Sequence, residues 1–243
     1  MTGELTHTDE IDFETLYLRL RQKEGRMYSN EELMRLPTIS KEHPHYREWL
    51  TRRQSSKKLV RYLERKKQKL NILEVGCGNG WLSHSLAKIP GTKVIGIDVN
   101  FTELEQAARV FQHIPNLHFI YTDIRNGTFK EKEFDIVVFA ASIQYFESLD
   151  NIVADSKKIL KPGGEIHIID SPFYDPSEIT TARQRSRIYY EQAGFPAMAN
   201  CYFHHSLPGL SPCSYEILFD PKKISNRIRR PRNPLYWIRI KND

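Results

Sequence analysis

The segment from Asn71 to Leu82, which reads NILEVGCGNGWL, constrains the fold of this chain more than any other segment. It begins with a mostly apolar run that favours a buried strand, and it continues into a loop with glycines at 76, 78 and 80. A second apolar run ends in Asp98, 22 residues after Gly76. Strand, glycine-rich loop, helix, and a second strand ending in an acid form the nucleoside-binding unit of doubly wound α/β proteins. The sequence therefore predicts a nucleoside site at this loop.

The position of the third glycine bears on whether the bound nucleoside belongs to a dinucleotide with a pyrophosphate. Dinucleotide-binding folds place that glycine where the helix packs closely against the strand, beside the pyrophosphate. In this chain Trp81 occupies that position, and the glycine stands one residue earlier, at Gly80. Because the indole would crowd a pyrophosphate, the spacing disfavours a nicotinamide-dependent oxidoreductase.

The segment Glu74–Gly80 resembles the first motif of the class I S-adenosylmethionine-dependent methyltransferases, Glu/Asp-x-Gly-x-Gly-x-Gly, at every fixed position. The segments 117–123, 134–146 and 159–170 resemble later motifs of that family in the same order. The resemblance is close over roughly residues 70–172. It implies an α/β fold with a doubly wound, seven-stranded, mostly parallel sheet whose last strand is reversed. It also implies S-adenosyl-L-methionine as the cofactor and methyl transfer as the reaction.

The resemblance also implies which residues contact the cofactor. Asp98 is expected to accept hydrogen bonds from the ribose hydroxyls, Val99 to lie against the adenine, and Asp123 to border the adenine edge. Each aspartate could instead cap a helix or a turn, and Glu74 could order the loop rather than touch the reacting groups. The predicted cofactor-binding residues are Glu74, Gly76, Cys77, Gly78, Asp98, Val99, Asp123, Ile124, Ala140 and Ala141.

The residues after the fourth predicted strand bear on the methyl acceptor. The family's nitrogen methylators of DNA and of some proteins carry an Asn/Asp-Pro-Pro-Tyr-type motif there, whereas this chain has AASIQY at 140–145. The resemblance therefore favours a small-molecule, quinone-like or lipid-like acceptor. Tyr145, His204 and His205 are the predicted catalytic residues, since a base would assist a hydroxyl acceptor and histidine titrates near neutral pH. The alternative is that both histidines only pack; no metal site is predicted.

The pattern of elements divides the chain in two. Residues 1–69 are predicted to form an N-terminal helical lid over the strand ends, and residues 70–243 a Rossmann-like core with a substrate-facing insert near 175–213. Strands are expected near 71–75, 93–97, 117–121, 134–139 and 164–169, with helices near 80–88, 102–111 and 150–160. A helix over 176–193, a long loop over 194–213, and an edge hairpin of strands 214–219 and 235–240 complete the expected fold.

The net charge of +6 is unevenly distributed, because residues 41–70 and residues 221–241 each carry +8 and the remainder carries −10. Such segments are usually solvated surfaces, but they keep open a methyltransferase acting on RNA or another polyanion. A non-enzymatic binding scaffold is a further alternative, although the loop glycines and Asp98 are all retained. With no signal-peptide pattern, no membrane-length apolar run, and three cysteines without metal-ligand spacing, the sequence predicts a cytoplasmic protein with reduced thiols. It leaves the oligomeric state open.

Overall fold

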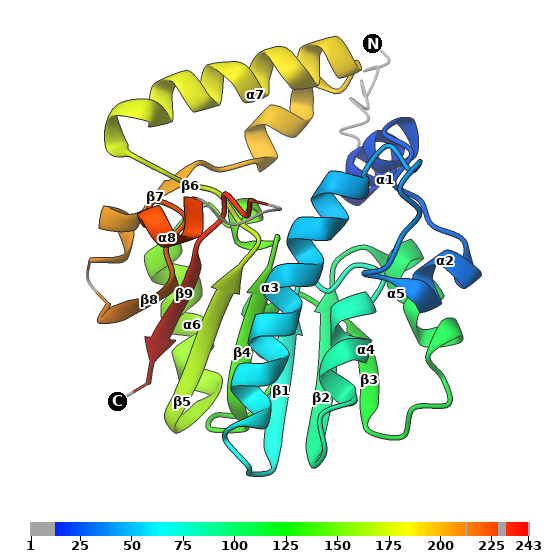
Figure 1. Ribbon diagram of the computed structural model, residues 1–243, viewed down its shortest axis with the longest axis vertical. Helices are drawn as coiled ribbons and strands as arrows, with labels where there is room; N and C mark the ends of the chain where they lie inside the picture. The colour runs from blue at the N-terminus through cyan, green and yellow to red at the C-terminus, as the bar shows by residue number, and fades with distance from the viewer. Residues whose placement is uncertain (1–12, 212, 228–231, 243) are drawn as a thin grey trace, which may run out of the picture.

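The computed structural model describes residues 13–211, 213–227 and 232–242 (Figure 1). Its main sheet has the strand order β3-β2-β1-β4-β5-β9-β8. These strands are β1 (Leu70–Val75), β2 (Thr92–Asp98), β3 (Leu117–Tyr121), β4 (Phe134–Ala140), β5 (Leu160–Ile169), β8 (Tyr215–Phe219) and β9 (Trp237–Lys241). The helices are α1 (Phe13–Lys23), α2 (Asn30–Arg35), α3 (Tyr46–Glu64), α4 (Trp81–Ala87), α5 (Phe101–Val110), α6 (Leu149–Ile159), α7 (Ile179–Ala193) and α8 (Ile224–Arg227).

The pairing of the strands confirms the predicted fold class. β1 pairs in parallel with β2 on one side and with β4 on the other, so the chain reverses its winding direction at β1. β9 runs antiparallel to both β5 and β8, which is the predicted reversed last strand. Open α/β sheets bind their ligands at such a reversal point, beyond the carboxyl ends of the strands. The topology therefore points to the ends of β1, β2 and β4.

The segment after β5 is more ordered than the long loop expected from the sequence. A short strand β6 (Phe173–Tyr174) pairs in parallel with β7 (His205–Ser206). Two 3-10 helices, η4 (Pro196–Cys201) and η5 (Leu207–Leu210), flank β7. Proline near the start of each 3-10 helix provides the fixed φ angle that such turns use. Residues 194–211 are therefore held in a defined conformation beyond the strand ends.

Both faces of the main sheet are covered by helices. In β1, Ile72 belongs to an apolar cluster with Leu82 of α4 and Ala107 of α5, whereas the neighbouring Leu73 belongs to a second cluster with Ile152 of α6. Successive side chains of a strand point to opposite faces, so a strand buried on both faces needs an unbroken apolar run. This is why the apolar residues of β1 include the adjacent pair Ile72 and Leu73 rather than strictly alternating with polar residues, although Asn71 and Glu74 interrupt the run.

Figure 1 shows the helix α3 lying along one face of the sheet and extending past the carboxyl ends of the strands. Leu59 and Leu63, in its second half, are completely or almost completely buried, in the same cluster as Ile72 of β1. Residues near the end of the predicted lid therefore contribute to the main core. A lid function of residues 1–69 remains a prediction, and residues 1–12 lie outside the described part of the chain.

Hydrogen bonds between buried polar groups also attach α3 to the sheet. The Tyr62 hydroxyl donates to Glu165 of β5 at 3.0 Å and accepts from Arg239 of β9 at 2.6 Å. Beside them, the Trp237 indole donates to Nδ1 of His167 at 3.0 Å, which leaves the His167 Nε2–H to face Glu165 at 3.2 Å. The second half of α3 is thus joined to β5 and β9 by polar as well as apolar contacts.

A third, smaller apolar cluster lies apart from the two that cover the sheet. Leu20 of α1, Tyr190 of α7 and Met198 of η4 are its buried members. In Figure 1, α7 extends across the top of the molecule, beyond the carboxyl ends of the strands, and α1 lies near one end of it. These elements pack mainly on one another, over the part of the sheet where the topology predicts a ligand.

Candidate functional site

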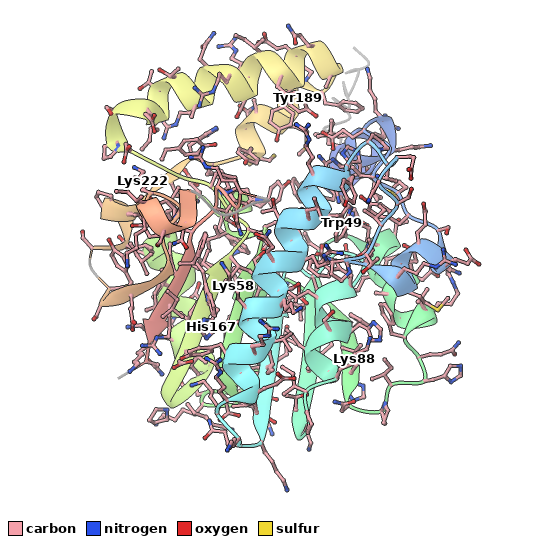
Figure 2. The ribbon with its side chains drawn as sticks, viewed as in Figure 1. Trp49, Lys58, Lys88, His167, Tyr189 and Lys222 are labelled. Atoms are coloured by element: carbon pink, nitrogen blue, oxygen red, sulfur yellow. The ribbon has the colours of Figure 1, made fainter. Side chains whose placement is uncertain are left out.

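Two adjoining cavities lie at the carboxyl ends of the strands. The first has a volume of about 500 Å³ and the second about 620 Å³. Five residues line both cavities and form the neck between them: Tyr17, Gly76, Gly78, Ala141 and Tyr145. Figure 2 labels Trp49 on α3 and Tyr189 on α7, and both side chains line the first cavity. A ligand longer than one cavity can therefore pass through the neck and occupy both.

The glycine loop forms the floor of the neck because its backbone has conformations that side chains rarely allow. Gly76 has φ +71°, and a Cβ atom there would lie 2.5 Å from Cβ of Ser142, well inside van der Waals contact. Gly78 has φ +51° and lines both cavities. The absence of side chains at these two positions leaves room for a ligand against the backbone.

Asp98 lies at the end of β2 and lines the second cavity. Its Oδ2 accepts a hydrogen bond from Gly78 N at 2.6 Å, and its Oδ1 accepts one from Asn100 N at 2.8 Å. Burial, together with the nearby Glu103 carboxyl, raises the pKa of Asp98 to about 7. The acid therefore fixes the glycine loop and presents its carboxyl to the cavity, as the sequence predicts for a ribose-binding residue.

The other residues predicted to surround the nucleoside line the same second cavity: Val99, Asp123 and Ile124. Asp123 caps the 3-10 helix η1 (Ile124–Asn126) and forms an ion pair with Arg125 at 2.6 Å. Hydrogen bonds from Arg125 lower the pKa of Asp123 despite its partial burial. Asp123 thus has the capping role that the sequence left open, and it also borders the cavity.

The remaining predicted cofactor residues, Glu74, Cys77 and Ala140, line the first cavity. Glu74 is 2% exposed and accepts a hydrogen bond from the Ser83 hydroxyl of α4. Burial raises the pKa of Glu74 to about 8, although the Ser83 hydrogen bond acts in the opposite direction. All ten residues predicted to bind a cofactor therefore line one or both cavities.

The raised pKa of Glu74 leads to a testable pH dependence. A carboxyl whose pKa is higher in the folded than in the unfolded state stabilises the fold fully only below about pH 4.5, and this contribution is lost as pH rises to about 8. We expect the free energy of unfolding of the ligand-free protein to fall over this range, and to fall less in Glu74→Gln. Urea unfolding at several pH values measures this. The exposed Glu105→Gln on α5 is the control; equal pH dependence in all three proteins would contradict the expectation.

The structure separates the three predicted catalytic residues. Tyr145 lines both cavities and packs edge-on against the rings of Phe13 and Tyr17, with centroid separations of 5.6 and 5.7 Å. His204 and His205 line neither cavity. The His204 ring is 2.8 Å from the Ser186 hydroxyl, and His205 Nε2 is 3.3 Å from the carbonyl oxygen of Ile143. The structure therefore brings Tyr145 to the site and places both histidines outside the cavities.

Several cavity residues were not predicted from the sequence. The first cavity is also lined by Trp49 and Arg52 of α3, by Arg21 of α1, and by Asp170, which directly follows β5. Phe13 and Glu14 of α1 line the second cavity. The helical spacing of α1 and α3 is visible in the sequence, but no local pattern indicates which of their side chains face the strand ends.

The described residues contain neither a membrane-spanning helix nor a cluster of metal ligands. No helix there is long and apolar enough to cross a membrane. No group of three or more His, Cys, Asp or Glu side chains in the same part of the chain is arranged to hold a metal ion. The second basic segment, 221–241, includes residues 228–231, which lie outside the described residues.

Comparison with known proteins gives consistent matches. Residues 72–164 match the family model of a methyltransferase domain. The chain is 33% identical over 116 residues to a demethylmenaquinone methyltransferase of Chlorobaculum tepidum, covering 48% of this chain and 46% of the relative. It is 32% identical over 110 residues to malonyl-[acyl-carrier protein] O-methyltransferase 1 of Ilyobacter polytropus, covering 45% and 41%. The chain thus spans less than half the length of these curated relatives.

A solved structure agrees in fold. The geranyl diphosphate C-methyltransferase from Streptomyces coelicolor, in complex with Mg²⁺, geranyl diphosphate and S-adenosyl-L-homocysteine, aligns with a TM-score of 0.56 and 13% identity. The alignment covers 83% of this chain and 85% of that one, and at this identity it shows the fold alone. The motif order, the family model over residues 72–164 and the curated relatives identify this part of the chain as a methyltransferase domain of the class I S-adenosylmethionine-dependent type.

Proposed function

We propose that this protein transfers the methyl group of S-adenosyl-L-methionine to a small-molecule acceptor. The observation that carries the proposal is the pair of cavities joined at Gly76, Gly78 and Ala141. The adenosine lies in the second cavity beside Asp98, and the methionine portion passes through the neck into the first cavity. The acceptor then approaches the sulfonium from the remaining space of the first cavity.

Methyl transfer from a sulfonium requires the protein mainly to orient the two reactants. The sulfonium is an activated methyl donor, so the protein has to align the acceptor with the sulfur–methyl bond and exclude water. Orientation of this kind supplies on the order of 7–11 kcal/mol of the barrier reduction. The tyrosines at the neck and the walls from α1, α3 and α7 provide a partly enclosed site in which the acceptor can be held in line with the sulfonium.

A small acceptor is supported by the enclosure of the first cavity and by the relatives. Its walls come from α1, α3 and α7 as well as from the sheet, and its volume of about 500 Å³ suits a small molecule. The curated relatives carry names that describe methylation of a quinone and of a malonyl thioester.

Calorimetry with S-adenosyl-L-methionine and S-adenosyl-L-homocysteine tests the proposed cofactor site. We expect Asp98→Ala to weaken binding of both by about 2 kcal/mol, roughly thirtyfold, because hydrogen bonds from the ribose to a charged group are lost. Asp150→Ala, an exposed acid in the first turn of α6, is the matched control and should bind normally. The assignment fails if the wild-type protein binds neither compound, or if a folded Asp98→Ala protein binds both as tightly as the wild type.

A further inference from the structure

Asp170 lies beside the neck, where the sheet ends. Ala140, the last residue of β4, pairs with Ile169 of β5, and Ala141 N donates to the Ile169 carbonyl at 2.9 Å. Ala141 lines both cavities, and Asp170 is the next residue after Ile169. The hydrogen-bonded ends of β4 and β5 therefore place Asp170 next to the point where the two cavities meet.

The backbone of Asp170 is held in an uncommon conformation. Its φ is +56°, in the left-handed region that non-glycine residues seldom adopt, although Asp and Asn tolerate it better than others. Such strained residues concentrate at functional sites, where the surrounding structure maintains them. Here the left-handed conformation follows the end of β5, and Asp170 lines the first cavity.

Only one of the two carboxyl oxygens of Asp170 accepts a hydrogen bond among the described residues. The residue is 7% exposed, and its Oδ1 accepts a hydrogen bond from the Ser55 hydroxyl of α3. Its Oδ2 is buried and has no hydrogen-bond partner among the described residues. An unsatisfied buried acceptor destabilises the fold, and more so when it is charged. Burial raises the pKa of Asp170, even though the positive charge of Arg52 and the Ser55 hydrogen bond oppose the shift.

The other acids at the cavities already have structural partners. Glu74 accepts from Ser83, Asp98 from two backbone amides, and Glu103 lies at the first turn of α5 within 3.4 Å of the Asn100 side chain. The positive charge of Arg52 acts on the Asp170 carboxyl, but the Arg52 guanidinium forms its own ion pair with Glu48 at 2.9 Å. Of these four acids, Asp170 is thus the one with a buried carboxyl oxygen that has no hydrogen-bond partner among the described residues.

Tyr17 and Tyr145, the two phenols at the neck, are poorly suited to take a proton, and burial raises the pKa of Tyr17 well above its ordinary value. Burial raises the pKa of Tyr145 above its ordinary value, which keeps the phenol protonated at neutral pH. A neutral phenol can donate a hydrogen bond but is a weak base. The carboxyl of Asp170 is therefore the better proton acceptor beside the neck.

We propose that Asp170 is a catalytic base that binds the O–H or N–H group of the methyl acceptor and takes its proton during methyl transfer. This inference rests on the proposed function and adds the class of acceptor, a protic nucleophile. The lone pair of the acceptor oxygen or nitrogen forms the bond to the methyl carbon. The carbon–sulfur bond breaks, its electron pair goes to sulfur to give S-adenosyl-L-homocysteine, and the proton of the acceptor passes to Asp170.

The test compares acceptors that differ in whether they lose a proton. Phenol and aniline are protic nucleophiles, whereas N,N-dimethylaniline is methylated without losing a proton. Each is supplied to the full chain at high concentration with S-adenosyl-L-methionine, and formation of S-adenosyl-L-homocysteine gives kcat and KM. The variants are Asp170→Asn, which retains the size and tolerates a positive φ, and Asp170→Gly, which relieves the backbone strain. Calorimetry with S-adenosyl-L-homocysteine reports on the cofactor site independently.

We expect both variants to lower kcat for the protic acceptor by roughly 100-fold or more, as loss of a general base does. Turnover of N,N-dimethylaniline and affinity for S-adenosyl-L-homocysteine should stay close to the wild-type values. The inference is overturned if the variants keep protic turnover, or if they lose turnover of N,N-dimethylaniline to the same degree. It is also overturned if the cofactor-binding wild-type protein methylates neither phenol nor aniline. Failure of the wild type to bind the cofactor would instead overturn the proposed function.

Discussion

Replacing Gly78 with valine is expected to lower the affinity for S-adenosyl-L-methionine by about a hundredfold or more, which corresponds to roughly 2.7 kcal/mol. Gly78 lines both cavities at the neck, so a branched side chain there would occupy the space through which the methionine portion passes. Within the protein, the nearest atom to a Cβ at this position would be Oε2 of the Glu103 carboxyl, at an ordinary contact distance of 3.4 Å. The clash is therefore with the ligand, and calorimetry measures it.

The matched control for this variant is Gly163→Val. Gly163 has φ +74°, similar to the +51° of Gly78, and a Cβ atom there would have nothing within 4 Å. Both variants place a side chain in the left-handed region at a cost of about 1–2 kcal/mol, so both should lose a similar amount of stability. Only Gly78→Val should lose cofactor affinity. Equal affinity in the two folded variants would show that the cofactor does not pass over Gly78.

Replacing Leu59 with alanine is expected to reduce the free energy of unfolding by about 2–5 kcal/mol, as truncation of a fully buried leucine usually does. Leu59 lies in the second half of α3, has no exposed surface, and packs in the cluster that includes Ile72 of β1. Met34→Ala on α2 is the control, because Met34 is 55% exposed. Urea unfolding followed by circular dichroism measures both variants. A loss below about 1 kcal/mol for Leu59→Ala would mean that α3 is a detachable cover rather than part of the core.

The sequence predicted the cofactor side of the site because that side is built from local pattern. Gly76, Gly78 and Asp98 each follow directly from an apolar strand, and their spacing along the chain determines their position in a parallel sheet. The sheet order followed from the alternation of strands and helices together with the family resemblance. These features depend on residues close together in sequence. The fold class was confirmed in the topology, and Gly76, Gly78 and Asp98 line the two cavities, whereas their contacts with the cofactor remain a prediction.

The acceptor side could not be predicted in the same way, because its residues meet only through the tertiary structure. The Ser55–Asp170 hydrogen bond joins residues 115 positions apart, and nothing near Asp170 in the sequence indicates its positive φ or its unpaired oxygen. Conversely, His204 and His205 stand out in the sequence within an aromatic segment, but Nε2 of His204 faces the Ser186 hydroxyl, Nε2 of His205 faces the Ile143 carbonyl, and neither residue lines a cavity. A sequence does not distinguish a histidine satisfied by packing from one that faces a cavity.

The two attachments of α3 have a consequence for the way ligands enter. The helix supplies Trp49 and Arg52 to the first cavity from its first half and is anchored in the main core by its second half. The opposite wall consists of α1, α7 and η4, which share the small separate cluster around Leu20 and Tyr190. Regions with few contacts to the main core open at much lower free energy than the core itself. We therefore expect the wall formed by α1, α7 and η4 to open at a lower free energy than the wall formed by α3, so that cofactor and acceptor enter from the side of α1 and α7.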